Sequence, residues 1–292
     1  MSPERPSRFS LVGPGRVGSS LAHWLVAAGV RLDVVAGRDP MRRNALAAAL
    51  GGTAVELDAL DSSGSDLLLL AVADPVLRPV AARLATRRQA PVVLHTSGAA
   101  PAEAIAPLRD QACAVGSLHP LKSFPRPLPD AEEGRGVVFG VDGDTEALTA
   151  AHGLASAVGG RSVVVPPGAR LAYHLAATLA SGGVVTLLAA ADEIARRHGL
   201  DESVLAGYVE LARGSLELAE TTRPVAAAIT GPVARGDVET VSAELTALAE
   251  RVPELGPLVA ELARTTLRLL AEVGEDAGAA HTGLRRFLAE AE

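Results

Sequence analysis

The chain has 292 residues, a formal net charge of −7 and only 2% aromatic residues. This length predicts about two domains and a core large enough for an enzyme. Because the chain is acidic and collects no basic residues among aromatic ones, we expect small-molecule partners and no nucleic acid.

The cysteine count and the polar first residues limit the compartment and the kinds of site that we expect. The first ten residues are polar, and no run of about 18 uninterrupted apolar residues follows, so we expect a cytoplasmic protein without a membrane partner. Cys113 is the only cysteine, which excludes an intrachain disulfide and a cysteine-based metal site. The seven histidines form no cluster in the sequence, and no metal is predicted.

A glycine-rich turn near the start organises the first half of the chain. An apolar run at 9–12 is typical of a buried strand, and apolar residues recur at helical spacing after the turn, up to residue 28. In a dinucleotide-binding turn the first glycine makes the bend, the second lets the backbone approach a pyrophosphate, and the third allows close packing. An incidental glycine-rich turn is the alternative. We predict a cofactor-binding turn made of Gly13, Pro14, Gly15, Arg16, Val17 and Gly18.

The type of cofactor is predicted from the end of a second strand at 31–36. An acid about 20 residues past the glycine turn binds the ribose 2′-OH of NAD, whereas an arginine there can hold the 2′-phosphate of NADP. Arg38 lies at this position, so we predict NADP as the cofactor. Asp39 beside it keeps NAD open, and an ordinary surface arginine is the alternative.

Strands and helices alternate up to residue 166. Helices are expected at 40–50 and 145–158, and further strands at 53–56, within 65–75, and at 91–98, 112–120, 136–141 and 161–165. The fold class is therefore α/β, a Rossmann doubly wound and mostly parallel sheet of about eight strands. The strand within 65–75 should lie beside the first strand, so that Ala73 and Asp74 flank the cofactor. Asp74 also fits an N-cap, and Ser97 is expected in a ligand loop that contacts cofactor or substrate.

From residue 167 onward the apolar spacing is helical throughout. Helices are predicted at 168–198, 201–220, 237–250 and 254–272, with a short last helix. The change of pattern gives two domains, 1–166 for NADP binding and 167–292 for substrate binding and dimerisation. The helix at 168–198 is long enough to form an interface, and we expect a homodimer.

Four side chains are candidates for the chemistry. His119 follows the strand at 112–120, Lys122 lies in the proline-rich loop after it, and His174 stands early in the helix at 168–198. Histidine, with a pKa near 6.5, suits proton transfer, and lysine suits a fixed positive charge. Arg235 lies in a turn fixed by glycine and proline, and its planar guanidinium fits a substrate carboxylate. The alternatives are a core or interface histidine for His174 and, for the turn Arg235-Gly236-Asp237, a helix entry in which Asp237 is only the N-cap.

The sequence resembles a family of bacterial proteins that join a Rossmann-like N-terminal half to a helical domain of unknown function. Four blocks carry the resemblance across nearly the whole chain: Val12-Gly-Pro-Gly-Arg-Val-Gly18, Leu118-His-Pro-Leu-Lys-Ser-Phe-Pro125, Tyr173-His-Leu-Ala-Ala177 and Thr230-Gly-Pro-Val-Ala-Arg-Gly-Asp237. These proteins are similar in architecture to the 6-phosphogluconate dehydrogenase-like group, which includes ketopantoate reductases, pyrroline-5-carboxylate reductases and deazaflavin-dependent NADP oxidoreductases. Some relatives resemble an alternative ketopantoate reductase. The resemblance implies an NADP-dependent reductase of a small 2-oxo acid and an all-α C-terminal domain.

The chain departs from the family pattern at two positions. Gly182 stands where the relatives usually carry an Asn, eight residues past the His, and Glu244 stands where they often carry a His. His119, His174 and Arg235 match the pattern. The departures keep open a dinucleotide-binding sensor or scaffold without catalysis. A reductase of a cyclic imine or a deazaflavin is a third alternative.

Overall fold

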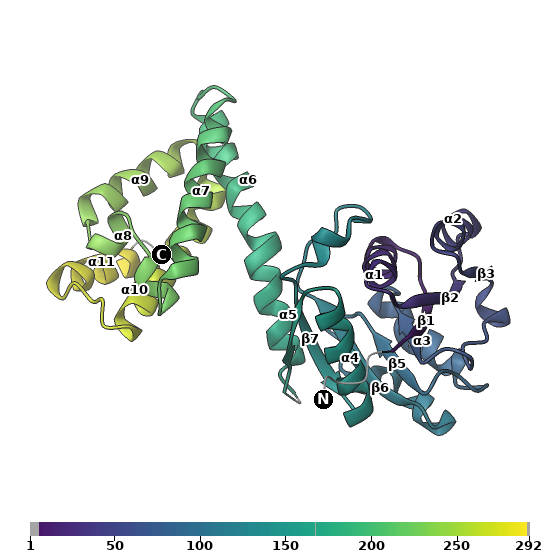
Figure 1. Cartoon of the computed structure of the whole chain (residues 1–292). Helices are drawn as coiled ribbons and strands as arrows, with labels where there is room; N and C mark the ends of the chain where they lie inside the picture. The colour runs from purple at the N-terminus through teal and green to yellow at the C-terminus, as the bar shows by residue number, and fades with distance from the viewer. Residues whose placement is uncertain (1–5, 167, 291–292) are drawn as a thin grey trace. The chain divides into compact units, whose positions relative to one another are not determined.

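The computed structural model describes residues 6–166 and 168–290, and its contacts divide the chain into two compact units, 1–181 and 182–292. The first unit contains an eight-stranded sheet in the order β3-β2-β1-β4-β5-β6-β7-β8 (Figure 1). Neighbouring strands are parallel except β6 and β7. This confirms the predicted Rossmann sheet, including the placement of β4 beside β1. The strands are β1 (Arg8–Val12), β2 (Arg31–Ala36), β3 (Thr53–Val55), β4 (Leu67–Leu70), β5 (Val92–His95), β6 (Ala114–Pro120), β7 (Val138–Gly143) and β8 (Arg161–Val164).

Helices cover both faces of the sheet, and each face has its own core. Leu67 and Leu69 of β4 join the core built with α1 (Arg16–Ala27), α2 (Pro40–Leu50) and α4 (Thr145–Ala157). Leu68 and Leu70 join the opposite core, built with α3 (Asp74–Leu84) and the 3₁₀ segment η2 (Ala102–Gln111). Successive side chains of a strand point to opposite faces, so a strand covered on both sides must be apolar throughout.

One local expectation in the first unit is wrong, and one element was not predicted. α3 begins at Asp74 itself, Ala73 occupies the N-cap position, and no side chain caps the helix. Asp74 therefore acts as an acid in the first turn, where it favours the helix dipole, and not as the cap. The connection from β5 to β6 is the segment η2, for which the sequence predicted no element; Pro107 inside it removes a backbone donor.

The proline-rich loop after β6 is held in place by the only tryptophan of the chain. Trp24 of α1 is buried and donates from Nε1 to the carbonyl of Leu128 over 2.9 Å. Its ring lies 5.8 Å from that of Phe124, centroid to centroid. The loop contains a single short 3₁₀ turn, η3 (Ala131–Gly134), among the described residues. The loop is therefore ordered by side-chain contacts and contains almost no regular structure, as its prolines predict.

The predicted helix at 168–198 is continuous but not uniform. It consists of α5 (Arg170–Thr178), a π-helical turn at Leu179–Gly183 and α6 (Val184–Arg197). The whole run Arg170–Arg197 is long and apolar enough, by length and mean hydropathy (1.6), to cross a membrane, a property that core helices of soluble proteins share. Polar residues lie inside this run, so the sequence shows no uninterrupted apolar stretch there. None of its most apolar window is buried within the chain.

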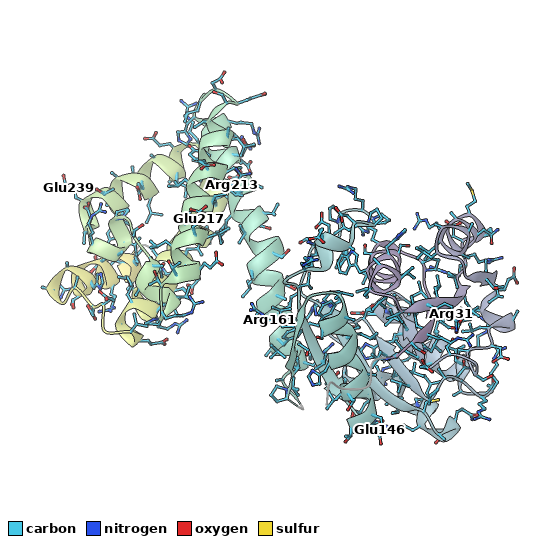
Figure 2. All side chains as sticks on the ribbon, in the orientation of Figure 1. Arg31, Glu146, Arg161, Arg213, Glu217 and Glu239 are labelled. Carbon is cyan, nitrogen blue, oxygen red and sulfur yellow. The ribbon has the colours of Figure 1, made fainter. Side chains whose placement is uncertain are left out.

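The second unit is helical throughout its described residues, as predicted. After α6 it contains α7 (Val204–Thr221), α8 (Pro232–Arg235), α9 (Val238–Arg251), α10 (Gly256–Glu272) and α11 (Ala279–Glu290). Its core is formed by Val241, Ala263, Leu267, Leu284 and Leu288 from three of these helices. Charged side chains of both units, such as Arg31, Glu146, Arg213 and Glu239, lie exposed on the surface (Figure 2).

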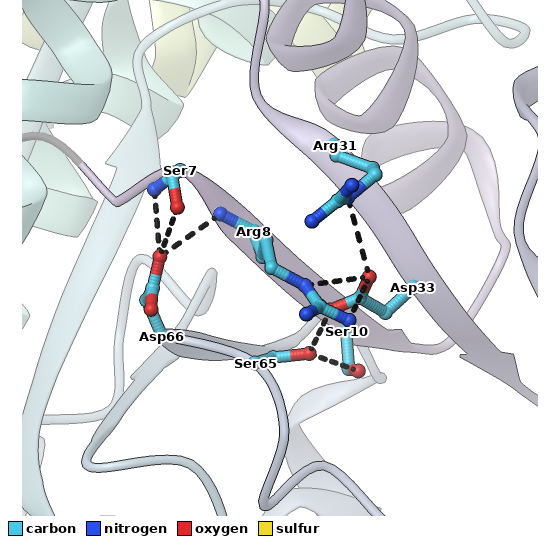
Figure 3. Close-up of polar contacts among 7 residues, drawn as sticks. All are labelled: Ser7, Arg8, Ser10, Arg31, Asp33, Ser65 and Asp66. Carbon is cyan, nitrogen blue, oxygen red and sulfur yellow. Dashed lines mark hydrogen bonds and ion pairs between the residues drawn. The ribbon is translucent and has the colours of Figure 1, made fainter.

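A polar network fastens the amino ends of β1, β2 and β4 (Figure 3). Asp66, just before β4, accepts from the N–H and Oγ of Ser7 at 2.8 and 2.7 Å and from the N–H of Arg8 at 3.0 Å. Asp33 of β2 accepts from Nε and NH2 of Arg8 and from Oγ of Ser65. Burial works against the Asp66 carboxylate, yet the hydrogen bonds from Ser7 and Arg8 outweigh it and lower its pKa. These contacts stabilise the amino edge of the sheet.

Loss of the Asp66 carboxylate should therefore destabilise the first unit. We expect Asp66→Ala to lower the free energy of unfolding by about 1–3 kcal/mol, because two backbone N–H groups lose their acceptor. In the wild type this stabilisation is complete above the unfolded pKa of about 4 and is lost as the pH falls through the lower folded pKa. Urea unfolding followed by Trp24 fluorescence at pH 7 and pH 3 measures both effects. Asp110→Ala, at an exposed carboxylate, is the control; equal losses in the two variants would contradict the prediction.

Candidate active site

The three glycines of the first turn differ in their surroundings. Gly13 has φ 95°, and a Cβ there would lie 2.4 Å from the carbonyl oxygen of Ala71. A Cβ on Gly18 would lie 2.2 Å from the carbonyl oxygen of Gly13, so this glycine allows α1 to pack against the turn. Gly15 stands at the N-cap of α1 with no side-chain cap, and no heavy atom lies within 4 Å of its Cβ position. The N-terminus of α1 is therefore open at Gly15, where its free N–H groups favour an anion.

A cavity of about 940 Å³ adjoins this turn. Of the residues predicted to bind a cofactor, it is lined by Gly13, Pro14, Gly15, Arg38 and Ala73. The others lie outside its lining. Arg16 donates to the carbonyl of Pro125, and Asp74 is exposed at the start of α3. Val17 packs against the core, and Gly18 packs against the glycine turn. Oγ of Ser97 accepts from the N–H of Ala100.

The structure resolves the roles of Arg38 and its neighbour. Asp39 caps α2 by accepting from the N–H groups of Met41 and Arg42, and it pairs with the Arg42 guanidinium at 3.2 Å. Arg38 is exposed, lines the cavity and has no ionic partner among the described residues. Three arginines that the sequence analysis did not single out, Arg42, Arg43 and Arg83, line the same cavity. Two consecutive arginines, Arg42 and Arg43, follow the turn in the sequence, and this pair could have indicated a positively charged binding site.

A second group of side chains gathers at the carboxyl ends of β5 and β6 within the first unit. His119 Nδ1 lies 2.8 Å from Oη of Tyr173, and the rings of His119 and His174 meet edge to face, 6.0 Å apart. A Cβ on Gly98 would lie 2.4 Å from Nδ1 of His174 and 2.7 Å from Nε2 of His119. Nδ1 of His174 is buried without a hydrogen-bond partner. The structure thus brings together two of the three predicted catalytic residues, on the edge of the sheet that also holds the glycine turn.

Arg170 is a buried cation close to this group, and the sequence did not indicate it. Arg170, the first residue of α5, is buried; its NH2 donates to the carbonyl of Ser97 at 2.6 Å, and its NH1 lies 3.6 Å from Oδ1 of Asp142. Its guanidinium lies 5.4 Å from the centre of the Tyr173 ring. Asp142 of β7 also accepts from Oγ of Ser117. No local pattern distinguishes Arg170 from a surface arginine at a helix start.

Burial and the Arg170 charge set the protonation of the site. Desolvation, followed by the charge of Arg170, lowers the pKa of His95 and of His119 to about 4. Both imidazoles are therefore neutral at pH 7, and each can act there as a hydrogen-bond donor or acceptor but not as a stored proton. His95, which is fully buried, bonds the carbonyl of Pro101 through Nε2 and the N–H of Ser97 through Nδ1. It shapes the loop that carries Gly98.

Lys122 lies in a different environment from the two histidines. Its Nζ pairs with Glu133 at 2.7 Å, and its side chain is partly buried. This carboxylate belongs to η3 in the proline-rich loop. The charge of Lys122 is therefore engaged within the loop.

Arg235 lies in the second unit, at the end of α8. Asp237 caps α9 by accepting from the N–H of Thr240, which confirms its capping role. His281 of α11 is fully buried and bonds the carbonyl of Ala234 at 2.9 Å, so α11 fixes the turn that presents Arg235. The Arg235 side chain is 66% exposed, with Asp237 4.0 Å away. Its guanidinium is thus presented on a rigid turn and remains accessible.

The two positions that depart from the family pattern also have defined places. Gly182 lies in the π-helical turn, with no heavy atom within 4 Å of its Cβ position. Glu244 lines a cavity of about 210 Å³ together with Thr230 and Pro232, which belong to the turn of Arg235.

Two family models match the chain. Residues 2–120 match a Rossmann-like domain, and residues 137–266 match a domain of unknown function, DUF2520. A search of curated protein sequences returns no match.

Several solved structures share the architecture. A protein of Thermotoga maritima is 27% identical, with a TM-score of 0.74 over 90% of this chain and 98% of that one. A candidate NADP oxidoreductase of Bacteroides fragilis is 21% identical, with a TM-score of 0.71 over 89% and 97% of the two chains. An imine reductase of Myxococcus stipitatus in complex with NADP⁺ is 19% identical, with a TM-score of 0.62 over 96% and 99%. These likenesses extend over both units of the chain.

The open Cβ position of Gly15 gives a direct test of the turn. We expect Gly15→Ala to leave the melting temperature unchanged, because φ is −84° and nothing occupies the space of the added methyl group. The methyl group would meet a pyrophosphate at the helix N-terminus, so the Kd for NADPH should rise by at least about tenfold, or 1.4 kcal/mol. Gly64→Ala, whose Cβ position is equally open but lies outside the cavity, is the control in fluorescence titrations. Unchanged NADPH affinity in Gly15→Ala would argue against the site.

Proposed function

Because the chain joins a Rossmann-like domain to a DUF2520 domain, we propose that it is an NADP(H)-dependent oxidoreductase that reduces a small 2-oxo acid such as ketopantoate. One observation carries the proposal. His119 and His174 converge at the carboxyl ends of β5 and β6, on the sheet edge where the glycine turn opens the N-terminus of α1. In open α/β sheets, ligands bind at this edge beside the switch point.

The residues at the glycine turn fit a phosphorylated dinucleotide. Gly15 leaves space at the helix N-terminus, and Arg38 is a cation without an ionic partner among the described residues. When bound, NADPH supplies the hydride. The chain must then stabilise negative charge on the carbonyl oxygen and provide a proton there.

We assign these tasks to the converging histidines and to Arg235. His174, whose buried Nδ1 has no partner, is the leading proton donor. Neutral His119 is the hydrogen-bonding partner that orients the carbonyl oxygen. Lys122 keeps the role of a fixed positive charge, and its ion pair with Glu133 holds it in place. The exposed fork of Arg235 suits the substrate carboxylate, and Ser97 contributes its loop beside Gly98.

The direct experiment is a screen of NADPH oxidation by the purified protein against 2-oxo acids, with ketopantoate first. Two alternatives are outcomes of the same screen. Reduction of a cyclic imine or of a deazaflavin would keep the enzyme class and change the substrate; an imine reductase is among the solved structures with a similar fold. NADPH binding without turnover of any of these would favour a sensor or scaffold protein, consistent with Gly182 in place of the Asn.

Arg38 should determine the preference for NADPH over NADH. A charge-assisted hydrogen bond to phosphate contributes roughly 1.5–3 kcal/mol, so Arg38→Ser should reduce the ratio of the two Kd values by about tenfold or more. Affinity for NADH should change little, because Asp39 remains engaged as the cap of α2. Arg31→Ser, which removes an exposed arginine outside the cavity, is the control in parallel titrations. Equal affinities for both cofactors in the wild type would refute the assignment.

His174 should control the rate and Arg235 the affinity for substrate. Loss of a general acid typically costs 10²–10⁴ in rate, so His174→Ala should lower kcat by about that factor with NADPH affinity retained. Arg235→Ala should mainly raise KM. His23→Ala, on α1, is the control for loss of a histidine outside the site. Turnover by His174→Ala at the wild-type rate would move the role to Lys122.

We also propose that the protein is a cytoplasmic homodimer formed through the run Arg170–Arg197. This run exposes Leu171, Leu175, Leu179, Val185 and Leu187, and soluble monomers rarely expose so continuous an apolar surface. Buried Arg170 fixes its start to the sheet unit, which favours a second copy over a bilayer. Sedimentation at micromolar concentration should show a dimer, and Leu175→Glu should dissociate it while Met41→Glu, at an exposed apolar side chain of α2, should not. A monomeric wild type would contradict the proposal.

A further inference from the structure

The contact between Tyr173 and His119 depends on a glycine in the neighbouring strand. A Cβ on Gly140 of β7 would lie 2.3 Å from Oη of Tyr173, so only a glycine leaves room for the phenol at this point. The backbone N–H of Gly140 acts to lower the pKa of the phenol. Gly140 pairs with His119 across β6 and β7, which places the phenol directly beside the imidazole. The position of Oη is thus fixed by the sheet.

The protonation of the phenol favours one direction for this hydrogen bond. Burial raises the pKa of the Tyr173 phenol, against the opposing influence of Arg170 and the Gly140 N–H, so the phenol keeps its proton at neutral pH. Among the described residues, the hydrogen-bond partner of Oη is Nδ1 of His119, 2.8 Å away, so a phenol that donates its hydrogen must donate it there. An imidazole that accepts through Nδ1 and is neutral must carry its proton on Nε2.

The proton on Nε2 then faces the part of the site that the histidines share. Nε2 of His119 and Nδ1 of His174 both point toward Gly98, and neither has a hydrogen-bond partner among the described residues. One ring nitrogen in this pair is therefore a committed donor. A neutral N–H donor of this kind suits a carbonyl oxygen on which negative charge develops.

Arg170 packs against Tyr173 and helps to keep its ring beside the His119 imidazole. The two residues lie one helical turn apart in α5, and the guanidinium packs against the phenol ring while its NH2 is bonded to the carbonyl of Ser97. The first turn of α5 is thereby fixed to the loop after β5, which holds the backbone of Tyr173 beside the imidazole.

We propose that Tyr173 is a positioning residue that fixes His119 in the tautomer protonated on Nε2, so that this N–H is the hydrogen-bond donor to the carbonyl oxygen of the substrate. The role of the donor rests on the proposed function, whereas the tautomer does not. Tyr173 itself touches the imidazole and need not touch the substrate.

The tautomer can be read in the protein without any ligand. In ¹⁵N-histidine-labelled protein at pH 7.5, long-range ¹H–¹⁵N correlation spectra distinguish protonated from unprotonated ring nitrogens, and His119→Gln identifies the His119 signals. We expect a protonated Nε2 and an unprotonated Nδ1 in the wild type. Tyr173→Phe keeps the ring but removes the hydroxyl, and His119 should then populate both tautomers while the other six histidines keep their signals. Tyr208→Phe, at the only other tyrosine of the chain, should change nothing.

Kinetics with NADPH and ketopantoate provide the second measurement. Tyr173→Phe should lower kcat by about tenfold, the effect of one misdirected hydrogen bond, with the KM for NADPH unchanged. A proton on Nδ1 in the wild type, or a His119 tautomer unchanged in Tyr173→Phe, would overturn the inference. If the tautomer is as expected but no 2-oxo acid is reduced, the proposed function fails and the assignment of Tyr173 stands.

Discussion

The buried guanidinium of Arg170 fixes the first turn of α5 to the carboxyl edge of the sheet. A cation in this position loses its hydration, and burial lowers its pKa, although Asp142 and Tyr173 oppose that effect. Nε and NH1 have no hydrogen bond among the described residues, so the site is not optimised for stability. The bond to the Ser97 carbonyl and the nearby Asp142 carboxylate are what hold it there. The positions of Tyr173 and His174 relative to His119 depend on this anchorage, because both residues follow Arg170 within about one turn of α5.

The amino edge of the sheet contributes stability, whereas the carboxyl edge carries the candidate active site. At the amino edge, Asp66 and Asp33 satisfy several donors each, and every contact there stabilises the fold. At the carboxyl edge, Arg170 and His174 retain unsatisfied nitrogens, and a glycine is required at Gly98 and Gly140 where side chains would otherwise collide. Polar groups that are buried without partners cost stability, and such costs concentrate at functional sites. The contrast supports the choice of the carboxyl edge as the active site.

The sheet could be predicted because its signals are local. The run Leu67–Leu70 requires cover on both faces, and Gly13-x-Gly15-x-x-Gly18 requires a strand before it and a helix after it. The boundaries of the helices after residue 200 follow from apolar spacing within a few residues. Interactions between distant segments were not accessible in this way. Arg170 meets Ser97 across 73 positions, and Tyr173 meets His119 across 54, so neither contact leaves a local pattern. Asp74 was misread because Asp followed by Pro fits both a cap and a first helical turn.

The desolvation that makes Arg170 costly also limits what the histidines can do. With pKa values of about 4, His95 and His119 hold no extra proton at neutral pH, and their N–H groups act only as dipoles. In the proposed reduction, the proton then comes through His174, whose buried Nδ1 has no hydrogen-bond partner among the described residues, and is replaced from solvent. The proposed function thus divides orientation of the substrate and supply of the proton between two neighbouring rings. Burial is the first cause of the low pKa of His119, and the charge of Arg170 at the start of α5 adds to it.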